Sequence, residues 1–77
     1  MDSVLADLVE IIAEETGLPA ADILPTHRFA DDLDLDPLGV FTIITLAEDK
    51  LKRAVADADI RTIQTVGDAA TLLADLV

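Results

Sequence analysis

The sequence predicts an all-α fold, a four-helix bundle with three longer helices and one short helix. Apolar residues recur at helical spacing in three separate segments, and no segment alternates between apolar and polar as a half-buried strand does. Residues that start or stop helices, among them Gly17, Pro19, Asp36 and Thr65, stand at the ends of these segments. A hydrophobic content of 52% also excludes a disordered acidic tail.

The first helix is expected over residues 3–16, and Gly17 followed by Pro19 ends it. One face of this helix carries Val4, Leu5, Leu8, Ile11 and Ile12. Residues 17–35 then form a connection that is long for a compact domain, with one short helical turn expected within 19–23. Such a connection must be held by its own apolar side chains, for which the candidates are Leu18, Ile23, Leu24, Phe29 and Leu33.

The second long helix is expected to begin at Asp36-Pro37 and to run to about Leu51. Asp is a preferred N-cap, and Pro suits the first helical position because its missing N–H is not needed there. Apolar residues cover most of the circumference of this helix, so we expect a central helix that is contacted from several sides. These residues are Leu38, Val40, Phe41, Ile43, Ile44, Leu46 and Ala47.

A short third helix is expected near residues 57–61, and the last helix follows Thr65. Asp68 stands three residues after Thr65, which is a variant of the capping box. No repeat or linker divides the chain. We therefore expect a single domain over residues 1–77.

The net charge of −11 and the pI near 4.1 narrow the range of partners. Phosphate backbones and anionic lipid surfaces repel such a chain, so we expect neither nucleic acid nor membrane as a partner. We expect a partner protein with a basic patch, and a chain that is monomeric when free. No apolar run is long enough to span a bilayer, and the start of the chain is acidic where a signal peptide is basic, so we expect the cytoplasm.

Residues 31–36 contain four carboxylates, a composition that could indicate a calcium-binding site. The spacing of Asp32, Asp34 and Asp36 matches the first three ligand positions of an EF-hand loop. The match ends there, because the sixth position is Pro37 instead of Gly and the twelfth is Ile43 instead of Glu. We expect no dedicated metal site; weak divalent binding and a solvated acidic cluster near a helix start both remain open.

The chain offers little for catalysis. It has no Cys, and its only Ser is Ser3, far in sequence from the lone imidazole of His27. So short a chain also leaves little room for a pocket that excludes water. We expect no catalytic residues, and the chain is predicted not to be an enzyme.

The order of these parts resembles the acyl carrier protein family over about residues 4–76. The matching segments are Phe29-Ala30-Asp31-Asp32-Leu33, Asp36-x-Leu38, Leu46-x-Glu48-Asp49 and Ile63-x-Thr65-Val66-Gly67-Asp68. In that family the motif Asp-Ser-Leu heads the second helix, and its serine hydroxyl receives a phosphopantetheine arm that carries acyl groups. Here the motif is Asp36-Pro37-Leu38, so Pro37 replaces the attachment serine. The resemblance therefore implies an atypical carrier, and we expect no bound cofactor.

The resemblance also implies docking on an acyl-processing enzyme of fatty-acid or polyketide-type biosynthesis. The expected docking residues are Asp36, Leu38, Glu48 and Asp49. The family usually has Gly at the position of Asp34 and an acid at the position of Gly39, so the acidic docking face is thinned here.

Two alternatives remain open. One is a non-covalent acyl-chain binder lined by Phe41, Ile44 and Ile63. The other is a small acidic interaction or regulatory module that is unrelated to acyl transfer. A helix arrangement without a long loop before a central helix would favour the second.

Overall fold

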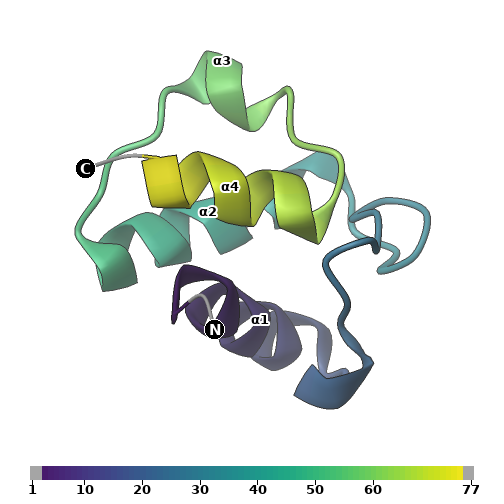
Figure 1. Ribbon diagram of the computed structural model, residues 1–77. Helices are drawn as coiled ribbons and strands as arrows, with labels where there is room; N and C mark the ends of the chain where they lie inside the picture. The colour runs from purple at the N-terminus through teal and green to yellow at the C-terminus, as the bar shows by residue number, and fades with distance from the viewer. Residues whose placement is uncertain (1–2, 76–77) are drawn as a thin grey trace.

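The computed structural model describes residues 3–75 and confirms the all-α prediction (Figure 1). Its elements in chain order are α1 (Ser3–Thr16), the 3-10 turn η1 (Ala20–Asp22), α2 (Pro37–Leu51), α3 (Asp57–Ile60) and α4 (Val66–Asp75). Residues 3–75 contain no strand, and their extended pairing is limited to an isolated antiparallel bridge between Arg28 and Thr65. The bundle thus has three longer helices and one short helix.

All the helices contribute to one apolar core. In Figure 1, α1 lies on one side of the bundle and α3 on the opposite side, and α1 packs against α2, α4 and η1. No polar or charged side chain is buried among residues 4–75. The largest fully buried side chains are Leu8, Ile12, Phe29, Ile43, Ile44, Val66 and Leu73.

The helix ends follow the expected chemistry. Gly17 has φ of +76° and its N–H donates to the carbonyl of Ala13, which closes α1 in the left-handed conformation that Gly adopts without strain. At the end of α2 the same conformation falls on Lys52, with φ of +56°, whose N–H donates to the carbonyl of Glu48.

The expectation that α2 is a central helix contacted from several sides is wrong, because one face of this helix is open. Only Ile43, Ile44 and Ala47 of this helix are buried. The opposite face is open, with Leu38 73% exposed, Phe41 41% and Leu46 40%. The difference arises from the tertiary packing, in which α1 and not α2 is the helix that contacts several other elements. The sequence of α2 is therefore more apolar than its packing inside this chain requires.

The connection over residues 17–35 is held by three of its five apolar candidates. Ile23, Phe29 and Leu33 are buried, whereas Leu18 and Leu24 are exposed, so the prediction was wrong for these two.

Backbone hydrogen bonds also hold residues 17–35 in place. The N–H of Phe29 donates to the carbonyl of Gln64 at 3.0 Å, the N–H of Val66 to that of His27 at 3.0 Å, and the N–H of Gly67 to that of Pro25 at 2.8 Å. The loop before α2 is thereby fastened to the start of α4.

Within residues 3–75, no helix is both long enough and apolar enough to cross a membrane. The predicted single domain over residues 1–77 stays a prediction.

Candidate functional site

The head of α2 is an exposed turn whose geometry is set by Asp36. Its Oδ1 accepts a hydrogen bond from the N–H of Gly39 at 2.7 Å, and its carbonyl accepts the N–H of Val40 at 3.1 Å. Pro37 occupies the first helical position, as expected, because no N–H is needed there. Asp36, Pro37 and Leu38 are all exposed. The motif singled out in the sequence therefore stands open to a partner.

No side-chain hydroxyl is available at the head of α2. Pro37 has none, and the first hydroxyl along the helix belongs to Thr42. Its Oγ1 donates to the carbonyl of Leu38 at 3.0 Å, just as Thr45 Oγ1 donates to the carbonyl of Phe41 at 2.9 Å. The residues at this turn therefore offer no hydroxyl that could form a phosphoester.

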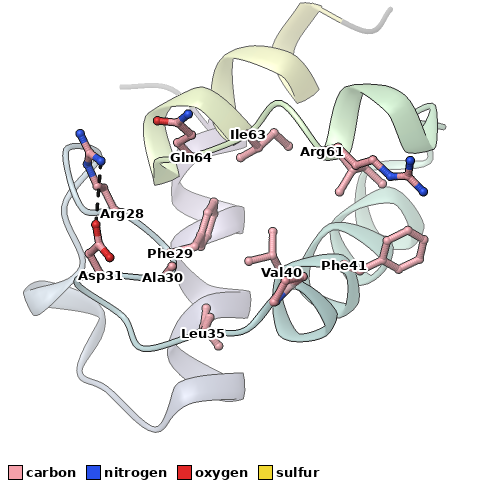
Figure 2. Close-up of a pocket in the computed structure, with 12 residues that line it drawn as sticks. Arg28, Phe29, Ala30, Asp31, Leu35, Val40, Phe41, Arg61, Ile63 and Gln64 are labelled. Atoms are coloured by element: carbon pink, nitrogen blue, oxygen red, sulfur yellow. Dashed lines mark ion pairs between the residues drawn. The ribbon is translucent and has the colours of Figure 1, made fainter.

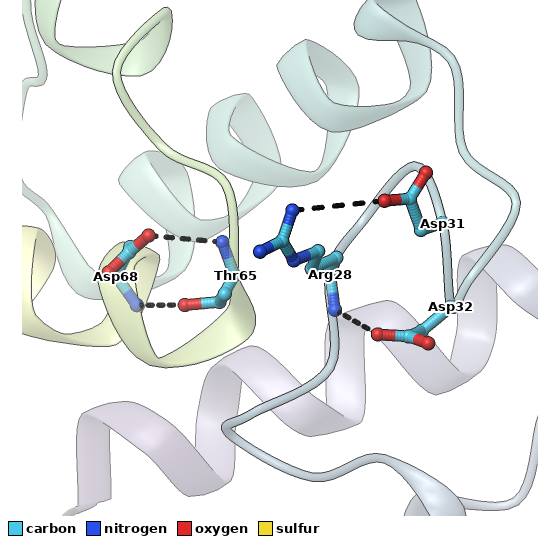
Figure 3. A network of polar contacts seen from close by, with 5 residues as sticks. All are labelled: Arg28, Asp31, Asp32, Thr65 and Asp68. Atoms are coloured by element: carbon cyan, nitrogen blue, oxygen red, sulfur yellow. Dashed lines mark hydrogen bonds and ion pairs between the residues drawn. The ribbon is translucent and has the colours of Figure 1, made fainter.

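The acidic approach to α2 is a hydrogen-bonded loop. Asp32 Oδ2 accepts the N–H of Arg28 at 2.8 Å, and Asp31 pairs with the guanidinium of Arg28 at 3.9 Å (Figure 3). Within residues 3–75 no group of three potential metal-ligating side chains is close enough to hold an ion. Asp34 has φ of +55°, the left-handed conformation that Gly adopts without strain. The cluster organises a turn.

The four expected docking residues lie along α2 but at its two ends. Asp36 and Leu38 precede Glu48 and Asp49 by about 15–20 Å at 1.5 Å of rise per residue. Leu38 and Asp49 are exposed and share a helix face with Thr42 and Thr45, at spacings of four, seven and eleven residues from Leu38. Glu48 is half-buried, and its Oε2 accepts the N–H of Val55 at 3.0 Å. Of the three acids, Asp49 alone makes no such hydrogen bond within residues 3–75.

A pocket of about 540 Å³ opens beside the head of α2 (Figure 2). The loop supplies Phe29 and Leu35, α2 supplies Val40, and the α3–α4 segment supplies Ile63; in Figure 2, Phe29, Val40 and Ile63 converge on its centre. Pro37 and Phe41 lie on its α2 wall. The polar residues that line it are Arg28, Asp31, Arg61 and Gln64.

The pocket differs from the one expected from sequence. Phe41 and Ile63 line it as predicted, but Ile44 is fully buried in the core and does not. Val40, Leu35 and Arg61 were missed, because they come from three separate segments that only the tertiary fold brings together. No spacing in the sequence signals that arrangement.

The start of α4 follows the pocket residues Ile63 and Gln64 and is capped by side chains. Asp68 N–H donates to Thr65 Oγ1 at 3.0 Å, and Asp68 Oδ2 accepts the N–H groups of Thr65 at 3.1 Å and Gln64 at 3.2 Å (Figure 3). These backbone hydrogen bonds, that of Thr65 first and that of Gln64 second, lower the pKa of the Asp68 carboxyl below its ordinary value of 3.8. The predicted capping box is present.

His27 takes part in loop geometry. Its Nδ1 accepts the N–H of Leu24 at 3.1 Å, and its carbonyl accepts the N–H of Val66. The half-buried imidazole therefore closes a turn of the loop.

The chain is similar to known proteins over most of its length. A family model described as "Phosphopantetheine attachment site" matches residues 6–73. An acyl carrier protein from Beutenbergia cavernae is 46% identical over 71 residues, which cover 92% of this chain and 87% of that protein. One from Myxococcus xanthus is 43% identical over 68 residues, which cover 88% and 86% respectively. A solved structure of the acyl carrier protein from Enterococcus faecalis matches with a TM-score of 0.76 and 27% identity, covering 92% of this chain and 90% of that one.

These matches correct the expectation that the chain has no cofactor. The matched family model is that of phosphopantetheine attachment and spans the head of α2, and the similar proteins are acyl carrier proteins. Phosphopantetheine is therefore the group that belongs with this fold. The expectation failed because it depended on one residue, Pro37, whereas the match extends over residues 6–73.

Proposed function

The chain belongs to the acyl carrier protein family of phosphopantetheine-attachment domains, and we propose that it docks on an acyl-processing enzyme of fatty-acid or polyketide-type biosynthesis. Members of this family are carriers and not catalysts, which confirms that the chain is not an enzyme. The observation that supports docking is the open face of α2, where Leu38, Phe41 and Leu46 are exposed on a helix whose other face is fully buried.

The proposed docking surface combines an apolar stripe with carboxylates at its ends. Leu38 is the most exposed large apolar residue among residues 3–75, and Asp36 and Asp49 flank the stripe. Glu48 joins this surface only through its exposed part, because its carboxylate also holds the N–H of Val55. A partner with a basic patch beside an apolar surface complements this arrangement.

A narrower proposal concerns position 37 alone. A phosphoester needs a hydroxyl, and Pro37 supplies none, so we propose that this position is not esterified in the chain as it stands. Pro37 is exposed and is the first residue of α2, a position that suits Pro. The replacement of a serine by Pro37 therefore leaves the surrounding fold intact.

Intact mass after incubation with coenzyme A and a broad-specificity phosphopantetheinyl transferase tests this proposal. We expect Pro37→Ser to gain one phosphopantetheine arm at position 37 and the wild type to gain none at that position. If the wild type is modified, peptide mapping locates the arm: an arm on residue 37 would contradict the proposal, and an arm on another hydroxyl would leave position 37 unesterified, as proposed. An unmodified Pro37→Ser variant would contradict the proposed docking surface, because the transferase itself must dock at this end of α2.

The rate of modification of Pro37→Ser also measures docking. In that background we expect Leu38→Ala and Asp49→Asn to slow the transferase, and we expect added salt to slow it further. Glu14→Gln is the matched control for Asp49→Asn, since it removes the same charge from an exposed position on α1. Equal rates for the α2 variants and the control, or a rate that is independent of salt, would count against electrostatic docking through α2.

The pocket favours a second candidate function, the non-covalent sheltering of an acyl chain. Its walls are Phe29, Leu35, Val40 and Ile63, and its volume of about 540 Å³ lies in the range of small-molecule sites. Titration with a fatty acid should shift the methyl resonances of Val40 and Ile63. Unchanged shifts would exclude this function.

The remaining proposals follow from charge. With a net charge of −11, we propose that the free chain is a monomer and binds neither nucleic acid nor membrane. Membership of the family and the long loop before α2 weigh against an acidic module unrelated to acyl transfer.

A further inference from the structure

Two of the five Lys and Arg residues line the same apolar pocket in a chain with 16 acids. Arg61 stands with Phe41 at one end of the pocket, and Arg28 stands with Asp31 at the other (Figure 2). Among the residues that line the pocket, two cations stand against one acid, Asp31, although the chain as a whole is acidic.

The other three cations are placed elsewhere. Lys50 Nζ lies 3.8 Å from Asp7 and 3.4 Å from Glu10, joining α2 to α1. Arg53 donates to the carbonyl of Leu73 near the end of α4. Lys52 is the exposed C-cap of α2. None of these three lines the pocket.

Arg61 is the cation at the pocket that no acid neutralises. Arg28 is paired with Asp31, although at 3.9 Å and with both side chains well exposed. The guanidinium of Arg61, at the C-cap of α3, makes no ion pair with any of residues 3–75. A guanidinium presents several N–H donors and suits carboxylate and phosphate groups.

We propose that this pocket binds a single-chain amphiphile with an anionic head group, a carboxylate or a phosphate, and that Arg61 contacts the head group. The proposal rests on the second candidate function above and adds the charge of the ligand and the residue that recognises it. The chain of the amphiphile lies against Phe29, Val40 and Ile63, and the head group stays at the exposed end beside Phe41. Binding is non-covalent, and Arg61 holds the polar end of the ligand.

The net charge makes this proposal easy to separate from general electrostatics. A chain with a net charge of −11 attracts cationic amphiphiles and repels anionic ones. A preference for the anion therefore requires a local cation at the site.

The test compares four probes with the same ten-carbon chain: decanoate, decyl phosphate, decan-1-ol and decylammonium. Each is titrated into the full chain below its micelle concentration, and binding is followed through the methyl resonances of Val40 and Ile63. We expect one or both anions to bind about tenfold more tightly than decylammonium, as one hydrogen bond to a charged group provides. Tighter binding of decanoate or of decyl phosphate identifies which head group is preferred.

Two variants locate the head group. Arg61→Gln should abolish the preference for anions and leave the affinity for decan-1-ol unchanged. Lys52→Gln is the matched control, because it removes the same charge from an exposed position that does not line the pocket, and it should keep the preference. An unaltered preference in Arg61→Gln, or its loss in Arg28→Gln alone, would overturn the assignment to Arg61.

The remaining outcomes separate this inference from the function on which it rests. If decan-1-ol and decylammonium bind as well as the anions, the pocket shelters chains but does not recognise a head group, and the inference fails alone. If no probe shifts the pocket methyl groups, the inference and the second candidate function fail together, while docking through α2 is untouched.

Discussion

The starts of α2 and α4 are capped by similar side chains, yet their surroundings differ. Asp36 caps α2, and Thr65 with Asp68 caps α4. The first N–H groups of α4, on Val66 and Gly67, donate to loop carbonyls, whereas at the corresponding place in α2 Pro37 has no N–H to donate. The start of α4 is therefore a joint that holds the loop in place, and the start of α2 is free surface.

This difference teaches where the molecule tolerates change. A substitution at the joint alters bonds between segments that are far apart in the sequence. A substitution at the open turn alters only the turn itself. The loss of a hydroxyl at position 37 is thus compatible with the fold, since the residue there is exposed at the edge of the pocket.

Gly67→Val should have the largest effect, because it breaks the joint. A Cβ at Gly67 would lie 3.0 Å from the carbonyl oxygen of Pro25, which is backbone and cannot move away cheaply. We expect a loss of about 2 kcal/mol in the free energy of unfolding, measured by urea denaturation.

Gly39→Val is the control at the open turn. There a Cβ would meet the side chain of Leu35 at 3.1 Å, which can rotate, and Oδ1 of Asp36 at 3.2 Å, which also accepts the N–H of Gly39. We expect a loss of about 1 kcal/mol, because the cap of α2 is weakened while no backbone segment has to move. Equal losses for the two variants would remove the distinction between the two helix starts.

Asp68→Ala should have the next largest effect, a loss of about 1 kcal/mol at neutral pH, because it removes the cap of α4. The pKa of Asp68 is lowered in the folded chain. Its carboxylate therefore stabilises the fold at pH values above 3.8, the ordinary pKa of the group. That contribution is lost as pH falls through the folded pKa. The difference between wild type and variant should therefore shrink below pH 3.8.

Amide exchange distinguishes this cap from that of α2. Asp68→Ala should speed exchange at Phe29, whose N–H donates to Gln64, while Asp36→Ala should leave Phe29 protected. Faster exchange at Phe29 in the Asp36 variant would show that the two starts are coupled.

Asp34 allows a smaller test on the approach to α2. Its φ of +55° suits Gly and strains Ala. We expect Asp34→Gly to be more stable than Asp34→Ala by about 0.5–1 kcal/mol in thermal unfolding. A variant pair of equal stability would mean that this turn relaxes to another conformation.

Pro37→Ser should have the smallest effect, within about 0.5 kcal/mol of the wild type in urea denaturation. Pro suits the first helical position because its missing N–H is not needed there, and a change to Ser at this exposed residue alters no packed contact of the core. A larger loss would show that Pro37 is needed for the fold and that the start of α2 is not free surface.

Local chemistry made much of the fold predictable. The helix over residues 3–16, the start of α2 at Pro37 and the capping box of Thr65 and Asp68 all follow from spacing and caps that act within a few residues. The predictions were less accurate wherever the burial or position of a side chain depends on segments that are distant in the sequence. Leu24 and Phe41 are as apolar as their buried neighbours but lie exposed, and the pocket gathers Leu35, Val40 and Arg61 from three elements.

The sequence by itself determined the helices, their caps, the absence of a hydroxyl at position 37 and the acidic charge, because these depend on residue type and on neighbours along the chain. The tertiary structure decided which face of α2 stays open, which loop carbonyls cover the start of α4, and that Arg61 lines an apolar pocket. Those outcomes depend on how helices pack against one another. Packing joins residues by contact in space, which their order in the sequence does not reveal.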